Sequence, residues 1–352
     1  MSTPSQPNLF AFATSELSQD AALAWLLAWA DPAHATADAP LHERGTSLLR
    51  TLLDRTGHGG RGTICRVEVQ TQYERVDVFV KVHHEGEEAP VALLIEDKVG
   101  AGPHGDQLAT YAAWGRDNYP DRAGLVYLKT HDGPRLIGEK HEDWFTFDRP
   151  ALLDVLEADP LPENDVYQAF LAHLRHIDAR HDCKALPVAE WTGADPWRGF
   201  FTALQRELQE HGELQNGSWG YVPNRKGGFM GYWWNGVEVD DGHVYLQIQG
   251  SHTGRPKGKL VFKLASRGRN AEERRSARTY WHEQLVTAGD QNGSLDVIKP
   301  NRFGHGKTMT VAELAGDIRQ WDGRGRLDLS QTKQRLIEAH ALLRRAARSS
   351  TR

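Results

Sequence analysis

The chain has 352 residues, enough for two domains that each bury a core, and its hydrophobic and charged fractions of 39% and 25% are ordinary for a globular protein. Its two cysteines, Cys65 and Cys183, are too few for a disulfide framework or a cysteine-based zinc site, so we expect a cytoplasmic protein. The apolar run from Ala21 to Ala30 is too short to span a bilayer, and no membrane partner is expected.

The net charge of −5 hides an asymmetry between the two halves of the chain. Residues 1–180 carry 16 Lys and Arg against 28 Asp and Glu, or −12, and residues 181–352 carry 26 against 19, or +7. A basic half attracts a nucleic-acid backbone through counterion release, whereas an acidic half repels phosphate until a cation neutralises it. The charge distribution therefore indicates a nucleic-acid partner and a cation in the first half.

The first half of the chain is expected to form a mixed β-sheet flanked by helices. Three strands, a helix and a fourth strand follow one another, and the helix supplies the crossover that a parallel pair of strands requires. Two prolines and a glycine between Leu186 and Pro196 indicate a domain boundary, giving domains 1–185 and 186–352. The expected elements of the first domain are helices near 18–30 (with Ser18 as N-cap) and 43–56, strands near 63–71, 75–83 and 91–98, a helix near 105–117, a strand at 123–129, and helices near 149–158 and 163–179.

The second half changes character and is expected to form an α+β domain with an antiparallel sheet. Short runs rich in Trp, Tyr, Val and Leu, separated by Gly and Asn turns, are typical of such a sheet. The expected strands lie within 219–224, 227–234, 244–249 and 259–264, and helices are expected near 197–211, 270–288, 310–320 and 330–347.

Polar residues interrupt two of the expected strands of the first domain. Asp77 lies in a run whose valines share the opposite face, because side chains alternate along a strand. The apolar run from Val91 ends in Glu96, Asp97 and Lys98, and the same alternation places Glu96 and Lys98 on one face and turns Asp97 away. Two carboxylates beside a lysine predict a site for a hard divalent cation next to a phosphodiester.

The chemistry of these residue types supports that prediction. Mg²⁺ prefers oxygen ligands, keeps several waters and is usually held by one or two protein carboxylates, which Asp77 and Glu96 can provide, with the backbone carbonyl of Asp97 as a third ligand. A neighbouring lysine, Lys98, can position the attacking water and stabilise charge on the phosphate.

These residues resemble the PD-(D/E)XK nuclease superfamily, whose signature is an aspartate on one strand, Glu-x-Lys on the next and often Gln-x-x-x-Tyr on a helix. The matching residues are Asp77, then Glu96 to Lys98, then Gln107 and Tyr111, with Val76 in place of the proline. The segment from Phe12 to Leu27 is similar to the first helix of a bacterial branch, in which a glutamate, here Glu16, joins the site.

The resemblance implies a fold, an activity and a setting. The fold is α/β, with a restriction-endonuclease-like mixed sheet. The activity is Mg²⁺-dependent nuclease activity, with Mn²⁺ as a substitute and DNA as the favoured substrate, in defence against foreign DNA such as that of viruses. The site implied is Glu16, Asp77, Glu96, Lys98, Gln107 and Tyr111, with Glu16 among the metal ligands. The second half is similar to the region that accompanies this branch, to which no chemistry is assigned.

Alternative interpretations remain at several positions. Glu16 is also a helix-start acid that interacts favourably with the helix dipole, Tyr111 can pack beside Trp114, and Glu68 is either a further site carboxylate or an exposed strand residue. The basic stretch 255–278, near Tyr232, Trp233 and Trp234, is either a nucleic-acid contact or a solvated face beside core aromatics. For the whole chain, the alternative is a non-catalytic nucleic-acid-binding or protein-interaction module, and a homodimer stays open.

Overall fold

The computed structural model describes residues 7–99, 105–134, 142–224, 227–234, 236–240, 242–251, 256–291, 293 and 295–350. The chain divides into two compact units, Met1–Ala179 and Arg180–Arg352. No helix in the described part of the chain is long and apolar enough to cross a membrane. Each unit is described by itself below.

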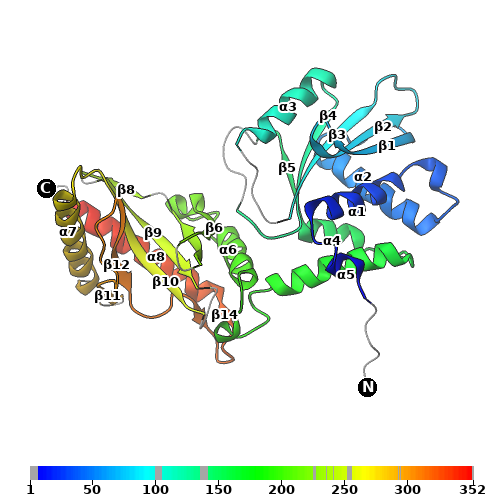
Figure 1. The fold of residues 1–352 in the computed structure, drawn as a ribbon. Coiled ribbons are helices and arrows are strands. Elements are labelled where there is room, and N and C mark those ends of the chain that lie inside the picture. Colours follow the sequence, from blue (N-terminus) through cyan, green and yellow to red (C-terminus); the bar gives the residue numbers. More distant parts are fainter. Residues whose placement is uncertain are drawn as a thin grey trace. The chain divides into compact units, whose positions relative to one another are not determined.

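The first unit contains a five-stranded sheet in the order β1-β2-β3-β4-β5. Strands β1, β2 and β3 are antiparallel neighbours, whereas β3, β4 and β5 run parallel, with α3 as the crossover between β3 and β4 (Figure 1). The predicted mixed α/β sheet is therefore confirmed. The elements are α1 (Glu16–Ala28), α2 (Ala39–Arg55), β1 (Ile64–Tyr73), β2 (Val76–His84), β3 (Val91–Lys98), α3 (Gln107–Asn118), β4 (Ala123–Lys129), β5 (Phe145–Asp148), α4 (Arg149–Leu156) and α5 (Asp165–His181).

The two faces of this sheet are buried against different helices. Leu93 and Ile95 of β3 pack in one core cluster with residues of α1 and α2, whereas Leu94 packs in another with Leu108 of α3. Figure 1 shows α3 on one side of the sheet and α1 and α2 on the other. Alternation along β3 therefore places Glu96 and Lys98 on the α3 side and Asp97 on the α1 side.

Helix α1 begins two residues before the expected start, and the predicted N-cap, Ser18, is wrong. The N-cap is Ser15, whose hydroxyl accepts a hydrogen bond from the backbone N–H of Ser18 at 3.3 Å. A short side chain that binds the third N–H of the helix is the usual way to satisfy these free donors. Glu16 is consequently the first helical residue, at the helix end that faces the strand termini.

The second unit contains a larger sheet, in the order β11-β12-β10-β9-β7-β6, with β8 paired to β9. All of its pairings are antiparallel, and α6, α7 and α8 contribute to one core cluster with the sheet, so the predicted α+β domain is confirmed. The elements are α6 (Asp195–Glu207), β6 (Ser218–Val222), β7 (Phe229–Trp233), β8 (Val237–Val239), β9 (Gly242–Gly250), β10 (Gly258–Ser266), α7 (Ala271–Asp290), β11 (Val297–Ile298), β12 (Thr308–Leu314), β13 (Gln320–Trp321), β14 (Leu327–Asp328) and α8 (Leu329–Ser350).

The helix expected near 310–320 is wrong, because strand β12 occupies its first part. Met309 and Val311 are buried in the core, and the strand pairs with β10 on one side and β11 on the other. Thr308, Thr310 and Val311 are β-branched and favour a strand. The apolar spacing around Ala312 fits a helix equally well, and pairing with two neighbouring strands decides between the two.

Candidate functional site

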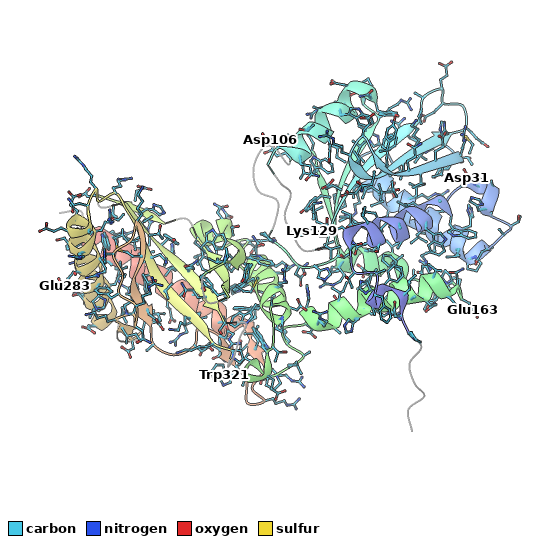
Figure 2. The ribbon with its side chains drawn as sticks, in the orientation of Figure 1. Asp31, Asp106, Lys129, Glu163, Glu283 and Trp321 are labelled. Carbon is cyan, nitrogen blue, oxygen red and sulfur yellow. The ribbon has the colours of Figure 1, made fainter. Side chains whose placement is uncertain are left out.

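Three carboxylates from three different elements converge on one lysine. Lys98, the last residue of β3, is 7% exposed. Its Nζ lies 2.7 Å from Glu96 Oε1 of the same strand, 3.7 Å from Glu16 Oε2 of α1 and 3.8 Å from Asp77 Oδ2 of β2. Four of the predicted site residues therefore meet at the end of β3. Lys129, the neighbour of Lys98 in the register of β4, is labelled in Figure 2 and marks this end of the sheet.

Glu96 is the most buried member of this cluster. It is 0% exposed, and its Oε2 has no hydrogen-bond partner among the described residues, while Oε1 faces Lys98 as an ion pair. Burial raises the pKa of Glu96 to about 7, with the charge of Asp77 adding to the rise and Lys98 opposing it. Burial acts to lower the pKa of Lys98, but Glu96, Asp77 and Glu16 outweigh it and raise that pKa overall. The lysine is thus held protonated among carboxylates.

Asp77 is oriented by the strand beside it. Its Oδ2 accepts a hydrogen bond of 3.0 Å from the backbone N–H of Asp97, and its Oδ1 accepts one of 3.1 Å from Gln72 Nε2. Gln72 has a φ of 55°, a left-handed conformation that is uncommon for residues with a side chain. The end of the β1–β2 hairpin therefore directs an amide toward Asp77.

Asp97 lies on the opposite side of β3 and belongs to a second polar cluster. Gln19 Nε2 lies 2.6 Å from both carboxylate oxygens of Asp97, and Thr130 Oγ1 donates to Gln19 Oε1 at 2.8 Å. This is the side-chain direction that strand alternation predicts. The expected role of the Asp97 carbonyl as a metal ligand stays a prediction.

Asp20 completes this second cluster and shares its charge with Asp97. Burial raises the pKa of Asp20 to about 7, with the charge of Asp77 adding to the rise. Burial also holds the pKa of Asp97 well above its usual range, and the charge of Asp20 contributes. Two buried carboxyl groups this close cannot both ionise easily, so the pair retains a proton near neutral pH.

Gln107 and Tyr111 share one face of α3, as predicted, and they interact with each other. Gln107 Nε2 donates to Tyr111 Oη at 3.1 Å, and Tyr111 Oη donates to the Arg75 carbonyl at 2.7 Å. In the described part of the chain neither side chain hydrogen-bonds to Glu96 or Lys98. The pair connects α3 to the β1–β2 hairpin, and its expected role in orienting Lys98 or contacting phosphate stays a prediction.

Glu68 does not join the cluster. Its Oε1 lies 3.1 Å from Arg66 and 3.0 Å from His83, on β1 and β2, so it forms a half-exposed ion-pair group of its own. Of the two interpretations of Glu68, the structure therefore supports the strand residue outside the site. A strand residue with a basic neighbour across the ladder is satisfied locally.

Sequence reasoning did not identify Gln19, Asp20, Thr130 and Gln72 as parts of the site. One signal for two of them is visible in hindsight. Gln19 and Asp20 follow Glu16 by three and four positions, so the three share a helix face, and that face is polar at the start of an otherwise apolar helix. Thr130 and Gln72 carry no comparable pattern.

The first cluster fits a hard divalent cation in its chemistry. Within residues 7–99 and 105–134, no group of three or more His, Cys, Asp or Glu side chains already stands in metal-ligand geometry. Mg²⁺ needs only one or two protein carboxylates, and the site offers Asp77 together with the unpartnered, buried Glu96 Oε2. The excess of carboxylates over lysine also favours a cation.

Comparisons of the chain with models of protein families, with curated proteins and with solved structures find no match. The interpretation of the site therefore depends on the residues of this chain and their geometry.

We predict that Asp20→Asn stabilises the protein in a pH-dependent manner. With a folded-state pKa of about 7, Asp20 keeps its proton in the folded chain between about pH 4 and pH 7 but loses it in the unfolded chain. Stability is therefore lost as the pH rises through this window, and asparagine removes that loss. Urea unfolding is expected to show a gain on the order of 2–4 kcal/mol at about pH 8 and little gain at about pH 4.

The matched control for this prediction is Asp117→Asn, on the exposed face of α3, which is expected to change stability little at either pH. An equal effect of Asp20→Asn at both pH values would contradict the raised pKa.

Proposed function

We propose that the first unit is a divalent-metal-dependent nuclease that hydrolyses phosphodiester bonds, with Mg²⁺ as its cofactor and DNA as its substrate. The observation that carries this proposal is the convergence of Glu16, Asp77 and Glu96 on Lys98. This acidic group lies at the end of a buried strand and holds a carboxylate oxygen without a partner. Such a site attracts a cation, and it attracts a phosphate once the cation is bound.

Asp77 and Glu96 would hold the cation, with Glu16 assisting directly or through water, and the Asp97 carbonyl as a further ligand. Mn²⁺ offers the same preference for oxygen ligands and is the expected substitute. When bound, the cation lowers the pKa of a coordinated water and polarises a phosphoryl oxygen.

The chain's own residues have separable roles in this proposal. Lys98 remains protonated among its carboxylates, so it donates hydrogen bonds to the attacking water and to the phosphate and stabilises developing negative charge. Gln72 and the Asp97 backbone N–H hold Asp77 in position. Gln19 holds the Asp97 side chain from the other face, which fixes the end of β3.

The substrate is proposed from charge and from the motif. The net charge of +7 over residues 181–352 supports a polyanionic partner, and DNA and a role in defence follow from the resemblance to the superfamily. The alternative is a non-catalytic nucleic-acid-binding module, whose function would not require Lys98.

We expect Lys98→Met to reduce DNA cleavage in the presence of Mg²⁺ by about 100-fold or more, because it removes the charge that faces the phosphate and leaves the carboxylates uncompensated. Plasmid cleavage followed by gel electrophoresis measures this rate, and Asp77→Asn is expected to have a similar effect. The control is Lys81→Met, a half-buried lysine of the neighbouring strand β2, which is expected to cleave at the wild-type rate.

Two results would sink the catalytic assignment. One is unchanged cleavage by both Lys98→Met and Asp77→Asn. The other is a wild-type protein that binds DNA with a steep salt dependence but cuts neither DNA nor RNA with Mg²⁺ or Mn²⁺, which would favour the binding module.

Cation binding is also expected to be visible without catalysis. A ligand that binds the folded state alone stabilises it, by about 2.7 kcal/mol at a concentration 100 times its Kd. We therefore expect Mg²⁺ and Mn²⁺ to raise the thermal midpoint of the wild type but not of Glu96→Gln. Glu68→Gln removes a carboxylate outside the cluster and is expected to retain the full shift, so a shift that survives in Glu96→Gln would place the cation elsewhere.

A further inference from the structure

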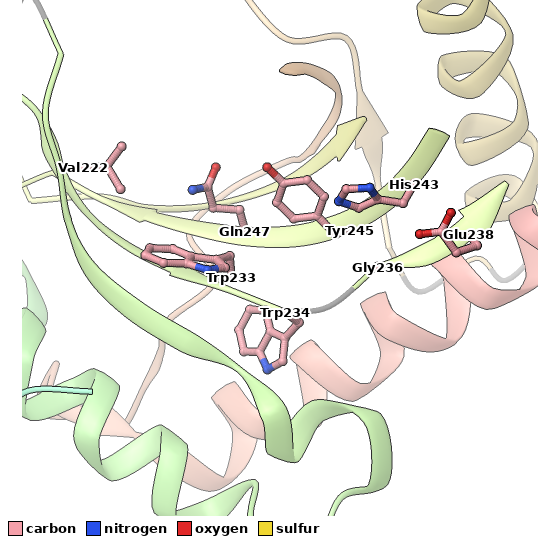
Figure 3. A pocket seen from close by; sticks show the side chains of 8 residues that line it. All are labelled: Val222, Trp233, Trp234, Gly236, Glu238, His243, Tyr245 and Gln247. Carbon is pink, nitrogen blue, oxygen red and sulfur yellow. The ribbon is translucent and has the colours of Figure 1, made fainter. Parts of the chain in front are cut away.

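The second unit contains a cavity of about 600 Å³, within the range of about 300–1,000 Å³ typical of small-molecule sites. Strand β9 separates it from the core: Val244, Leu246 and Ile248 are buried among the helices, while the alternate residues line the cavity. Figure 3 shows His243, Tyr245 and Gln247 in a row on this strand, with Trp233 of β7 beside Gln247. The cavity therefore lies on the face of the sheet turned away from the core.

The lining offers aromatic rings and a free amide. Trp233 is half-buried and lies directly opposite Gln247 in the β7–β9 ladder. Gln247 accepts a hydrogen bond of 3.2 Å from Gln249, but neither its own amide N–H nor the Trp233 indole N–H has an acceptor in the described part of the chain. The rings of His243 and Tyr245 lie 5.4 Å apart in a stacked arrangement. The cavity therefore offers flat aromatic rings and a hydrogen-bond donor close to one another.

The neighbouring Trp234 has a different role. Its Nε1 donates to the Leu214 carbonyl at 2.9 Å, and its ring stacks on the fully buried Tyr232. Trp234 is therefore anchored in the core, and Trp233 is the tryptophan that remains available to a ligand.

Several cations of the basic stretch 255–278 are already engaged by other groups of the chain. Arg255 lies outside the described residues. Lys259 pairs with Glu313 at 2.9 Å, Arg267 pairs with Glu238, and Arg278 donates to the Phe303 carbonyl at 2.7 Å.

Lys263 differs from these residues. In the described part of the chain it has neither an ion pair nor a hydrogen-bond partner, and burial alone lowers its pKa. It lies directly opposite Tyr245 in the β9–β10 ladder, so the two side chains lie on the same face of the sheet, with Lys263 next to the lining residues rather than one of them.

The charges at the cavity favour an anion over a cation. Glu238 is the carboxylate of the described lining, and Arg267 already neutralises it. An aromatic cage for a quaternary ammonium group needs its rings free of a competing cation, and Lys263 beside Tyr245 opposes this. A ligand that combines a flat polar ring with a negative group matches both the rings and the lysine.

We propose that this cavity binds a nucleotide, with its base stacked on Trp233 and hydrogen-bonded by the Gln247 amide, and its phosphate at Lys263. The base and phosphate can come from single-stranded nucleic acid or from a free mononucleotide. The site lies within the second unit and does not depend on cleavage by the first.

The test uses the full chain in EDTA, so that no cleavage can occur. Binding of a labelled single-stranded DNA of about ten nucleotides is followed by fluorescence anisotropy, and binding of nucleoside 5′-monophosphates by calorimetry. Trp233→Ala is expected to weaken binding about tenfold, because stacking on an aromatic ring is lost, while Trp233→Phe retains most of it. The matched control is Trp321→Ala, a 51% exposed tryptophan of the same unit labelled in Figure 2.

Lys263→Met tests for a direct contact between the lysine and phosphate, because a purely structural role of Lys263 would not change the salt dependence of binding. It is expected to lower the slope of log affinity against log salt by about one for the oligonucleotide, whereas the exposed Lys307→Met leaves the slope unchanged. Binding of the monophosphates identifies a mononucleotide site, and binding of the oligonucleotide alone identifies a strand site; both support the proposal. Binding of neither probe, an affinity unchanged by Trp233→Ala in a folded protein, or preferential binding of a trimethyl-lysine peptide would overturn it.

Discussion

The burial of carboxyl groups on both faces of β3, at the end where Lys98 lies, is the constraint on which the first unit depends. Glu96 and Asp97 are fully buried, and Asp20 is nearly so. An ionised carboxylate removed from water costs several kcal/mol unless it is paired. Lys98 offsets the negative charge on one side of the strand, and a retained proton reduces the negative charge on the other side. The negative charge that remains on the Lys98 side is what the proposed cation would neutralise.

The two polar clusters on either side of β3 have different chemical characters. On the α3 side, Lys98 offsets the charge of the buried Glu96 and of the more exposed Asp77 and Glu16. On the α1 side, Gln19 links Thr130 to Asp97 through a chain of hydrogen bonds. The first cluster carries the proposed chemistry, while the second connects the end of β3 to α1 and to Thr130. A site that must place oxygen atoms to within a fraction of an ångström benefits from such a support.

The sequence predicted the sheet of the first unit well because its strands carry strong local patterns. Alternation in β2 and the apolar run of β3 determine which way Asp77, Glu96 and Lys98 point, and these directions follow from the pleat alone. The contribution of Gln19 could not be predicted in this way, since it depends on where α1 crosses the end of β3. The strand at 308–314 was missed for a related reason: its neighbours β10 and β11 decide its conformation, and they are distant in sequence or very short.

The alternation of Glu96, Asp97 and Lys98 also bears on how accurately the chain folds. If β3 paired with β2 one residue out of register, Glu96 and Lys98 would enter the apolar layer beneath α1, and Leu93 and Ile95 would turn toward α3. Each mispaired form would bury an unmatched charge, and it would lose the contacts to Asp77 and Gln19 together. The charged triplet therefore disfavours pairing of β3 in the wrong register. Correct pairing of the sheet also brings the site residues together.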